Sequence, residues 1–473
     1  MPKPSIRNLS LVTACLLVAV VVGCHIDTSN TTRSTTRNPQ ADVAPTAPRA
    51  PVGTTAPAGP VVAEQPGRER LPALTSEPLI GVLLATGPQV AVILARPGWF
   101  EAQGRRVPVP AGTLRVEAGS TGLRTDLTGK TVLGYDLVIH VTPVAGQETF
   151  SALLMPPNGK AQKLSFSGQP EVHLDRASRK AQLVERVGME TYLAGVLVTE
   201  VNPAWPLEAL KAQAVVARSY AADRYLQNIA APWQLHWHYT VDMAYGGLKT
   251  LSPRVATVLA QTRGDLLTYK GLPVPTLFHA CSGGKTESAQ HFRPDLKGAD
   301  GVTDMTVVMP VVEDPEGIVG AEGLGMTATH LAWRAELSLT KVSASLKEWA
   351  ANHPQDRLAF GSVVAVRPFS RFPDSGRVAE VTIRHLLGRH ETDTRMPATD
   401  FRLAVGPGIV RSTNWTRCVV AAADGGTLVV EGRGYGHGVG MSQVSAWQLA
   451  RVGQGADDIL KRFYPGAALT KSW

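Results

Sequence analysis

A glutamate stands where an apolar segment meets a proline-bounded helix start. Glu200 follows the apolar run 193–198 and precedes Pro203 and Pro206, and Pro206 is expected to open a helix. Apolar surroundings raise the pKa of a carboxyl group, and a general acid that works near neutral pH needs a raised pKa. Glu200 is therefore a candidate acid catalyst. The alternative is a carboxylate that only stabilises a helix start.

The expected helix carries polar residues on both flanks of an apolar stripe. Lys211 and Arg218 are seven residues apart, which places them about 20° from each other around a helix. They form a cationic edge, and Gln213 and Tyr220 form a polar edge on the other flank. Taken alone, the cationic edge is typical of a solvated helix face. The stripe is thin, so the helix should lie close to its neighbours; it consists of Leu207, Leu210, Ala214, Ala217 and Ala221.

Glycine occupies every second position of residues 432–440. Successive residues of a strand face opposite ways, so one face of such a strand would be bare. The other face would present Arg433, Tyr435, His437 and Val439. A bare face lets a ligand or another backbone approach closely, so a binding site and a tightly packed strand crossing both fit. The glycines share one parity, which excludes the G-x-G-x-x-G fingerprint of dinucleotide-binding proteins.

Composition excludes several classes of protein. The chain has 473 residues, of which 44% are apolar, which is enough for a sizeable core and excludes wholesale disorder. Its four cysteines exclude a disulfide scaffold, and no long apolar run beyond the N-terminus indicates a polytopic membrane protein. The net charge of +8 is modest for this length and does not indicate a nucleic-acid partner.

Residues 1–24 are typical of a secretory signal. Lys3 and Arg7 precede a short apolar stretch, and the segment 21–24 resembles a bacterial lipobox that ends in Cys24. We therefore expect a lipid-anchored, extracytoplasmic protein, with secretion after ordinary cleavage as the alternative. In a Gram-negative cell, His25 after the cysteine favours the periplasmic side of the outer membrane.

A disordered tether and a folded part are expected to follow the signal. Residues 25–77 contain eight prolines and no aromatic residue, so they cannot bury enough apolar surface to fold. Residues 78–175 are predicted to be β-rich, and residues 176–473 to carry the main motifs. Further helices are predicted at residues 339–352 and after Ser442, and strands at residues 361–367, 377–385 and 427–431. The expected fold class is α+β, β-rich with a few helices.

Five segments in order along the chain resemble the SpoIID (stage II sporulation protein D) family, which includes the LytB-type amidase enhancers. The resemblance covers about residue 80 to the C-terminus. Its strongest segment is NPAWPLEALKAQAVVARSYA, which begins two residues after Glu200. The segments are residues 202–221, 276–289, 401–415 and 432–466, with a weaker one at 332–346.

The resemblance implies a peptidoglycan lytic transglycosylase. Such an enzyme cleaves the MurNAc–GlcNAc bond, leaves a 1,6-anhydro sugar and typically prefers glycan strands stripped of stem peptides. The resemblance assigns the acid/base role to Glu200. Ordinary glycoside hydrolysis uses two carboxylates, whereas one suffices when the sugar's own hydroxyl attacks. The residues expected to bind substrate are Lys211, Arg218, Ser219, His279, Ser282, Arg433, Tyr435, His437 and Tyr464.

Neither a metal nor another cofactor is expected. Some family members hold zinc with one histidine and two cysteines after the first helix. Here the corresponding residues 233–245 contain His236 and His238 but no cysteine. Cys281 and Cys418 could pair in an oxidising compartment or stay free, and their spacing leaves both states open.

Two other functions compete with the enzyme. The chain could bind peptidoglycan without cleaving it and activate an amidase, or it could tether the wall to the membrane as a structural lipoprotein. The intact set of Glu200, Lys211 and Arg218 favours the enzyme, because a pure binder has no need of a positioned acid. The expected partners are glycan strands, a membrane through Cys24 and, in the activator case, an amidase.

Overall fold

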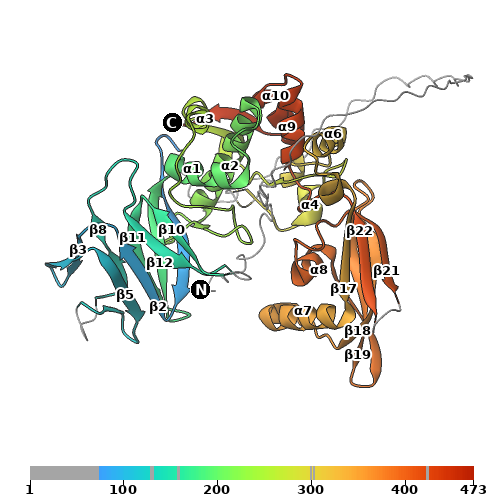
Figure 1. The fold of residues 1–473 in the computed structure, drawn as a ribbon, viewed down its shortest axis with the longest axis horizontal. Coiled ribbons are helices and arrows are strands. Elements are labelled where there is room, and N and C mark those ends of the chain that lie inside the picture. Colours follow the sequence, from blue (N-terminus) through green and yellow to red (C-terminus); the bar gives the residue numbers. More distant parts are fainter. Residues whose placement is uncertain (1–73, 128–132, 157–159, 299–300, 302–303, 422–425) are drawn as a thin grey trace, which may run out of the picture. The chain divides into compact units, whose positions relative to one another are not determined.

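The computed structural model describes residues 74–127, 133–156, 160–298, 301, 304–421 and 426–473 (Figure 1). They form a mixed α+β structure rich in strands, which confirms the expected fold class. The predicted signal, Cys24 and nearly all of the tether lie outside the described residues. Within the ranges given above, no helix has both the length and the apolar character needed to cross a membrane.

The first described part is built of strands. Hydrogen bonds arrange them in the orders β13-β1-β12-β11-β7, β10-β9-β2-β5-β6 and β4-β3-β8. Along β2, Val90, Val92 and Leu94 are buried while Gln89 and Ala91 are exposed, which is the alternation of a strand with one face on a core. The strands are β1 (Leu79–Gly87), β2 (Gln89–Leu94), β3 (Gly98–Ala102), β4 (Arg105–Val109), β5 (Gly112–Ala118), β6 (Leu123–Thr125), β7 (Asp136–Val138), β8 (His140–Val141), β9 (Phe150–Leu154), β10 (Gln162–Phe166), β11 (Gln169–Asp175), β12 (Lys180–Gly188) and β13 (Leu235–His236).

Helix α2 (Leu207–Gln227) is a hub, because it packs against α1 (Met189–Glu200), α3 (Pro253–Gln261), α9 (Gln443–Arg451) and α10 (Ala456–Phe463). The alanines of its predicted stripe are buried, so neighbours approach closely, as expected. Shorter elements complete this part: α4 (Ala289–Phe292), α5 (Met305–Val308), α6 (Pro315–Gly323), a π-helical turn (Thr327–Leu331), β14 (Asp265–Tyr269), β15 (Leu272–Pro273), β16 (Phe278–His279), β23 (Met441–Ser442) and β24 (Ala468–Lys471).

A second hydrophobic cluster belongs to residues 333–432. It lies among the sheets β17-β22-β21 and β18-β19-β20 and two helices, and it includes Trp333, Phe401 and Trp415. The elements are β17 (Trp333–Ser338), α7 (Leu339–Asn352), a 3₁₀ turn (Pro354–Asp356), β18 (Ser362–Arg371), β19 (Val378–Leu387), β20 (His390–Pro397), α8 (Ala398–Val405), β21 (Trp415–Ala421) and β22 (Thr427–Gly432).

Several local predictions are confirmed and one is wrong. Helix α7 has the predicted bounds, and α9 follows Ser442. The strands predicted at 361–367, 377–385 and 427–431 overlap β18, β19 and β22, of which β18 and β19 each begin one residue later than predicted. The glycine-rich segment, however, is not a strand, because β22 ends at Gly432. Gly434, Gly436, Gly438 and Gly440 instead have φ between 69° and 108°, a region that favours glycine. The alternation therefore serves a left-handed backbone path rather than a bare strand face.

Candidate functional site

Glu200 is the last residue of α1, and its side chain is fully buried. Its Oε1 accepts a hydrogen bond from the Ala244 N–H at 2.6 Å, whereas Oε2 has no hydrogen-bond partner among the described residues. Burial raises the pKa of Glu200 to about 8, and the one backbone hydrogen bond offsets this only in part. The C-terminal end of a helix also disfavours negative charge. The carboxyl group is therefore protonated at neutral pH, with Oε2 free to carry the proton.

Three polar side chains lie around this glutamate. The Gln443 Nε2 of α9 is 3.4 Å from both the Glu200 carbonyl oxygen and the Gln213 Oε1. Burial raises the pKa of Tyr192, and the charges of Asp242 and Glu200 raise it further, so its ring lies within electrostatic reach of both carboxyl groups. The Tyr192 Oη, Gln213 Nε2 and Gln443 Oε1 are buried without a hydrogen-bond partner in the described structure. Such atoms cost free energy in a plain core, so their gathering beside Glu200 indicates a functional site.

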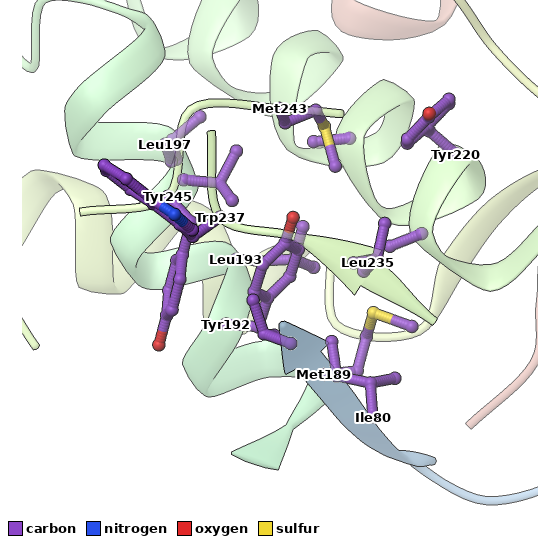
Figure 2. Packing of buried hydrophobic residues seen from close by; sticks show 14 of the residues in the cluster. Ile80, Met189, Tyr192, Leu193, Leu197, Tyr220, Leu235, Trp237, Met243 and Tyr245 are labelled. Carbon is purple, nitrogen blue, oxygen red and sulfur yellow. The ribbon is translucent and has the colours of Figure 1, made fainter. Parts of the chain in front are cut away.

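The segment after β13 covers the site with apolar side chains. Trp237, Met243 and Tyr245 are buried, and Figure 2 shows them gathered near Leu193 and Leu197 of α1. The Tyr245 ring lies 4.8 Å from the Tyr192 ring, centroid to centroid. This wall removes water from the surroundings of the carboxyl group, which is the physical origin of its raised pKa.

Asp242 holds the covering segment in place. It accepts hydrogen bonds from the His236 N–H at 2.7 Å and from the Tyr220 hydroxyl at 2.6 Å, and it lies 3.6 Å from the Arg224 Nε. Two residues further on, Ala244 donates its N–H to Glu200. The anchoring of Asp242 therefore sets the position of the hydrogen-bond donor that Glu200 uses.

The two cations of the predicted edge of α2 differ in exposure. The Arg218 side chain is fully buried and donates two hydrogen bonds to the Glu190 carboxylate, at 3.0 and 2.8 Å. Lys211 is half-buried and donates to Glu208 Oε1 at 2.7 Å. Helical spacing put both cations on one side correctly, but it could not show that carboxylates of the protein already hold them. In this state neither cation is a free anion-binding group.

Two further predicted residues make structural hydrogen bonds. The buried Ser219 hydroxyl donates to the Val215 carbonyl and accepts from the Leu267 N–H, both at 2.7 Å. The buried Tyr464 hydroxyl donates to the Leu277 carbonyl at 2.6 Å and accepts from the Met441 N–H at 3.1 Å. The bonds of Ser219 join α2 to β14. The bonds of Tyr464, the residue after α10, join that helix to the residue before β16 and to the start of β23.

His279 and His437 meet in a second buried polar region. Their rings are 5.6 Å apart, and in both the Nε2 atom is buried without a partner in the described part of the chain. Burial lowers the pKa of His437 to about 3, so its ring is neutral. The strand pairing of β16 with β23 places His279 opposite Ser442, directly before Gln443. This region is thus continuous with the surroundings of Glu200.

Ser282 belongs to a buried network around an aspartate. Its hydroxyl donates to Asp314 Oδ2 at 2.5 Å, and the Ser445 hydroxyl donates to the same oxygen at 2.7 Å. The two other predicted residues of the glycine-rich segment are accessible: Arg433 is exposed, and Tyr435 is half-buried with its ring 5.3 Å from that of His330. Ser282 therefore belongs to an internal hydrogen-bond network, whereas Arg433 and Tyr435 are accessible.

Metal-ligand groupings and disulfides are also addressed by the structure. Among the described residues, no three His, Cys, Asp or Glu side chains are grouped so that they could hold a metal ion. Burial lowers the pKa of His236 and lowers that of His238 to about 4. Cys281 and Cys418 are both free thiols, which resolves the pairing that their spacing had left open.

Among the cavities formed by the described residues, two lie close to these elements, and Glu200 is not among the residues that line either of them. One of about 1100 Å³ runs along α1 at Glu190 and Ala194 and includes Lys249 and Arg263. The other, of about 960 Å³, lies beside β11 and the end of α2. Because the Glu200 side chain is fully buried, part of its surroundings has to move before a ligand can touch it.

Sequence reasoning missed four residues of the site. Tyr192 is eight residues before Glu200, which is two turns of α1, and recognising that helix would have placed both on one face. Gln213 was placed on a polar edge, and Gln443 lies within the glycine-rich match, but no local pattern joins them across 230 residues. Asp242 stands in a segment without periodicity, so nothing in the sequence indicated its role.

Comparison with known proteins agrees with this arrangement. Residues 177–269, which include Glu200 and α2, match the family SpoIID, described as Stage II sporulation protein. The chain is 30% identical over 285 residues to an uncharacterized protein of Brachyspira hyodysenteriae, covering 60% of this chain and 67% of the relative. It is 27% identical over 305 residues to the stage II sporulation protein D of Bacillus subtilis, covering 62% and 77%.

A longer relative is the amidase enhancer of Bacillus subtilis, at 25% identity over 295 residues. That match covers 59% of this chain but only 40% of the enhancer, so the chain spans less than half of that protein. The matched motifs, the mixed α+β structure and the buried glutamate before α2 lead to one conclusion: the chain belongs to the SpoIID family.

Proposed function

We propose that this protein is a lytic transglycosylase that cleaves MurNAc–GlcNAc bonds of peptidoglycan, with peptide-stripped glycan strands as preferred substrate. One observation carries the proposal: Glu200 is a buried carboxyl group with a pKa raised to about 8, and its Oε2 has no hydrogen-bond partner among the residues that the structure describes. A carboxyl group in this state is a proton donor at neutral pH. Membership of a family whose relatives are named for sporulation and for amidase enhancement supports work on the cell wall.

The proposed reaction needs one carboxyl group. Glu200 gives its proton to the glycosidic oxygen, and the bond between that oxygen and C1 of MurNAc breaks. The C6 hydroxyl oxygen of the same sugar bonds to C1 and returns its proton to Glu200. The products are a 1,6-anhydro end and a free GlcNAc hydroxyl, and no water is consumed. The dry wall of Trp237, Met243 and Tyr245 suits a step from which water is excluded.

The predicted binding residues take different parts in this proposal. Arg433 and Tyr435 are accessible and can touch a glycan directly, and Lys211 is half-buried. The others are buried and support the site from within: Arg218, Ser219, His279, Ser282, His437 and Tyr464. No metal or other cofactor takes part in the proposed reaction.

The full burial of Glu200 also favours a second function. A fold in which the acid stays covered could bind peptidoglycan without cleaving it and act on an amidase, as the name of one relative suggests. In both cases we propose an extracytoplasmic protein held to the membrane through Cys24 and reaching the wall by the tether 25–77.

A buried control glutamate separates the two functions. Glu185 is also fully buried with a pKa raised by burial to about 7, but it lies in β12, and its oxygens accept from Gly168 N–H and the Tyr245 hydroxyl. The purified full chain, Glu200→Gln and Glu185→Gln are incubated with denuded glycan strands, and the products are analysed by mass spectrometry. We expect anhydro ends from wild type and Glu185→Gln, and none from Glu200→Gln. If all three bind glycan and none cleaves it, the enzyme is refuted and the activator is supported.

A further inference from the structure

A cavity away from Glu200 has a lining suited to sugars. It has a volume of about 960 Å³ and lies between β7, β11, the end of α2 and residues 230–233. None of the residues proposed above for catalysis or binding lines it. Its size is that of a site for a ligand of several rings.

Two aromatic side chains line this cavity. Trp233 is half-buried, and its Nε1 lies 3.3 Å from Gln182 Oε1, which fixes the indole in place. Tyr135 is 42% exposed, and the Arg176 guanidinium lies 3.7 Å from its ring centroid. A β-linked pyranose presents a flat face of axial C–H groups, which packs on an aromatic ring while its hydroxyls stay at the edges. The exposed Tyr135 and the half-buried, hydrogen-bonded Trp233 are therefore suited to packing against sugar rings.

Carboxylates, guanidinium groups and a histidine line the cavity together. The lining includes Asp136, Asp175, Arg176 and Arg224, and His173 Nδ1 lies 2.8 Å from Asp136 Oδ1. A site for phosphate or nucleic acid needs an excess of cations. The mixed set of carboxylates, guanidinium groups and an imidazole instead supplies both acceptors and donors to a ligand with many hydroxyl and amide groups.

The cavity also borders Arg224, which lies close to the aspartate that anchors the segment covering Glu200. Arg224 lines the cavity and lies 3.6 Å from Asp242, the residue that anchors the segment covering Glu200. The Arg224 Nε is buried without a hydrogen-bond partner within the described structure. A ligand in the cavity would therefore lie against the same ion pair that positions the Ala244 N–H.

We propose that this cavity binds a β-1,4-linked chain of N-acetylated amino sugars, with Trp233 and Tyr135 as stacking platforms, and that it is a glycan subsite outside the cleavage site. The inference rests on the proposed function for its choice of glycan. It names a substrate-binding site that is separate from Glu200.

Binding of a fluorescein-labelled hexamer of β-1,4-linked N-acetylglucosamine tests the subsite by fluorescence anisotropy with the full chain. Tyr135→Ala and Trp233→Ala should each weaken binding about ten-fold, equivalent to ~1.4 kcal/mol. Phe369→Ala is the matched control, because Phe369 is 46% exposed, with the Arg395 guanidinium 3.5 Å from its ring centroid. Tyr135 is a surface side chain, so its variant keeps the test valid even if Trp233→Ala unfolds.

The outcomes separate the subsite from the proposed function. Unchanged binding by Tyr135→Ala, an equal loss in Phe369→Ala, or no binding of the hexamer by wild type would each overturn the subsite. Binding that depends on Tyr135 in a wild-type chain that does not cleave glycan would support the subsite while refuting the transglycosylase. Cleavage that requires Glu200, together with hexamer binding that Tyr135→Ala leaves unchanged, would support the transglycosylase and overturn the subsite.

Discussion

Replacing Glu200 with glutamine should stabilise the protein at alkaline pH and not at acidic pH. Glutamine keeps the shape and the Oε1 acceptor for the Ala244 N–H but carries no charge. The wild-type carboxyl group must ionise at high pH in a fully buried place where its Oε2 has no partner in the described chain. Relief of that cost is the expected gain.

The expected gain in the free energy of unfolding follows from the pKa of Glu200. In the unfolded chain Glu200 ionises near 4.5, and in the folded protein burial raises this to about 8. The folded state therefore holds the proton more tightly, so this group's contribution to stability is greatest below pH 4.5 and is lost as pH rises to 8. At ~1.36 kcal/mol per pH unit, the loss is about 3 kcal/mol at pH 7 and roughly 5 kcal/mol above pH 8.

Urea unfolding of wild type and Glu200→Gln at pH 5 and pH 8 measures this difference. The midpoint of the variant should exceed that of wild type clearly at pH 8 and only slightly at pH 5. Glu185→Gln should raise the urea midpoint by a smaller amount, because the pKa of Glu185 is raised only to about 7. For the same reason, this increase should reach its full size at a lower pH than the increase for Glu200→Gln. A gain for Glu200→Gln that is equal at both pH values would refute the claim that a buried, protonated carboxyl group occupies this position.

Two further predictions concern stability. Arg218→Ala leaves the Glu190 carboxylate without its two strongest donors in a mostly buried place, and should cost about 3–5 kcal/mol in urea unfolding; a loss below 1 kcal/mol would contradict the buried pair. Gly440→Ala would put a Cβ 2.0 Å from the Leu277 carbonyl oxygen, so its melting temperature should fall well below that of Gly453→Ala. Gly453 also has a positive φ but no neighbour within 4 Å, so equal losses would mean that backbone strain alone matters.

Local patterns predicted elements well and long-range contacts poorly. Helix α7 has its predicted bounds because Val342 and Leu346 recur at helical spacing on a buried face. The partial desolvation expected for Glu200 is complete, since the apolar run before it packs in the core. The role of Arg218 could not be predicted, because Glu190 lies 28 residues earlier on a helix that spacing did not reveal.

The prediction of a strand for the glycine-rich segment was wrong for a different reason. Its period of two matches a strand, and a strand is what side-chain alternation predicts. The glycines instead supply positive φ angles and close backbone approach, as where Gly434 meets the carbonyl oxygens of Cys281 and Ser282. Composition indicates such freedom, but the path of the chain is set by contacts that a one-dimensional pattern does not contain.

The hydrogen bond from Gln443 to the Glu200 backbone has a consequence for the timing of assembly. It joins residues 243 positions apart, so the surroundings of Glu200 are complete only after most of the chain has been made and has closed a very long loop. A chain that emerges from a membrane with its N-terminus first would carry Glu200 outside well before α9 arrives. Under the proposed export, the site would thus stay incomplete until α9 had followed, and the proposed activity would begin only after the C-terminal part had folded against α1 and α2.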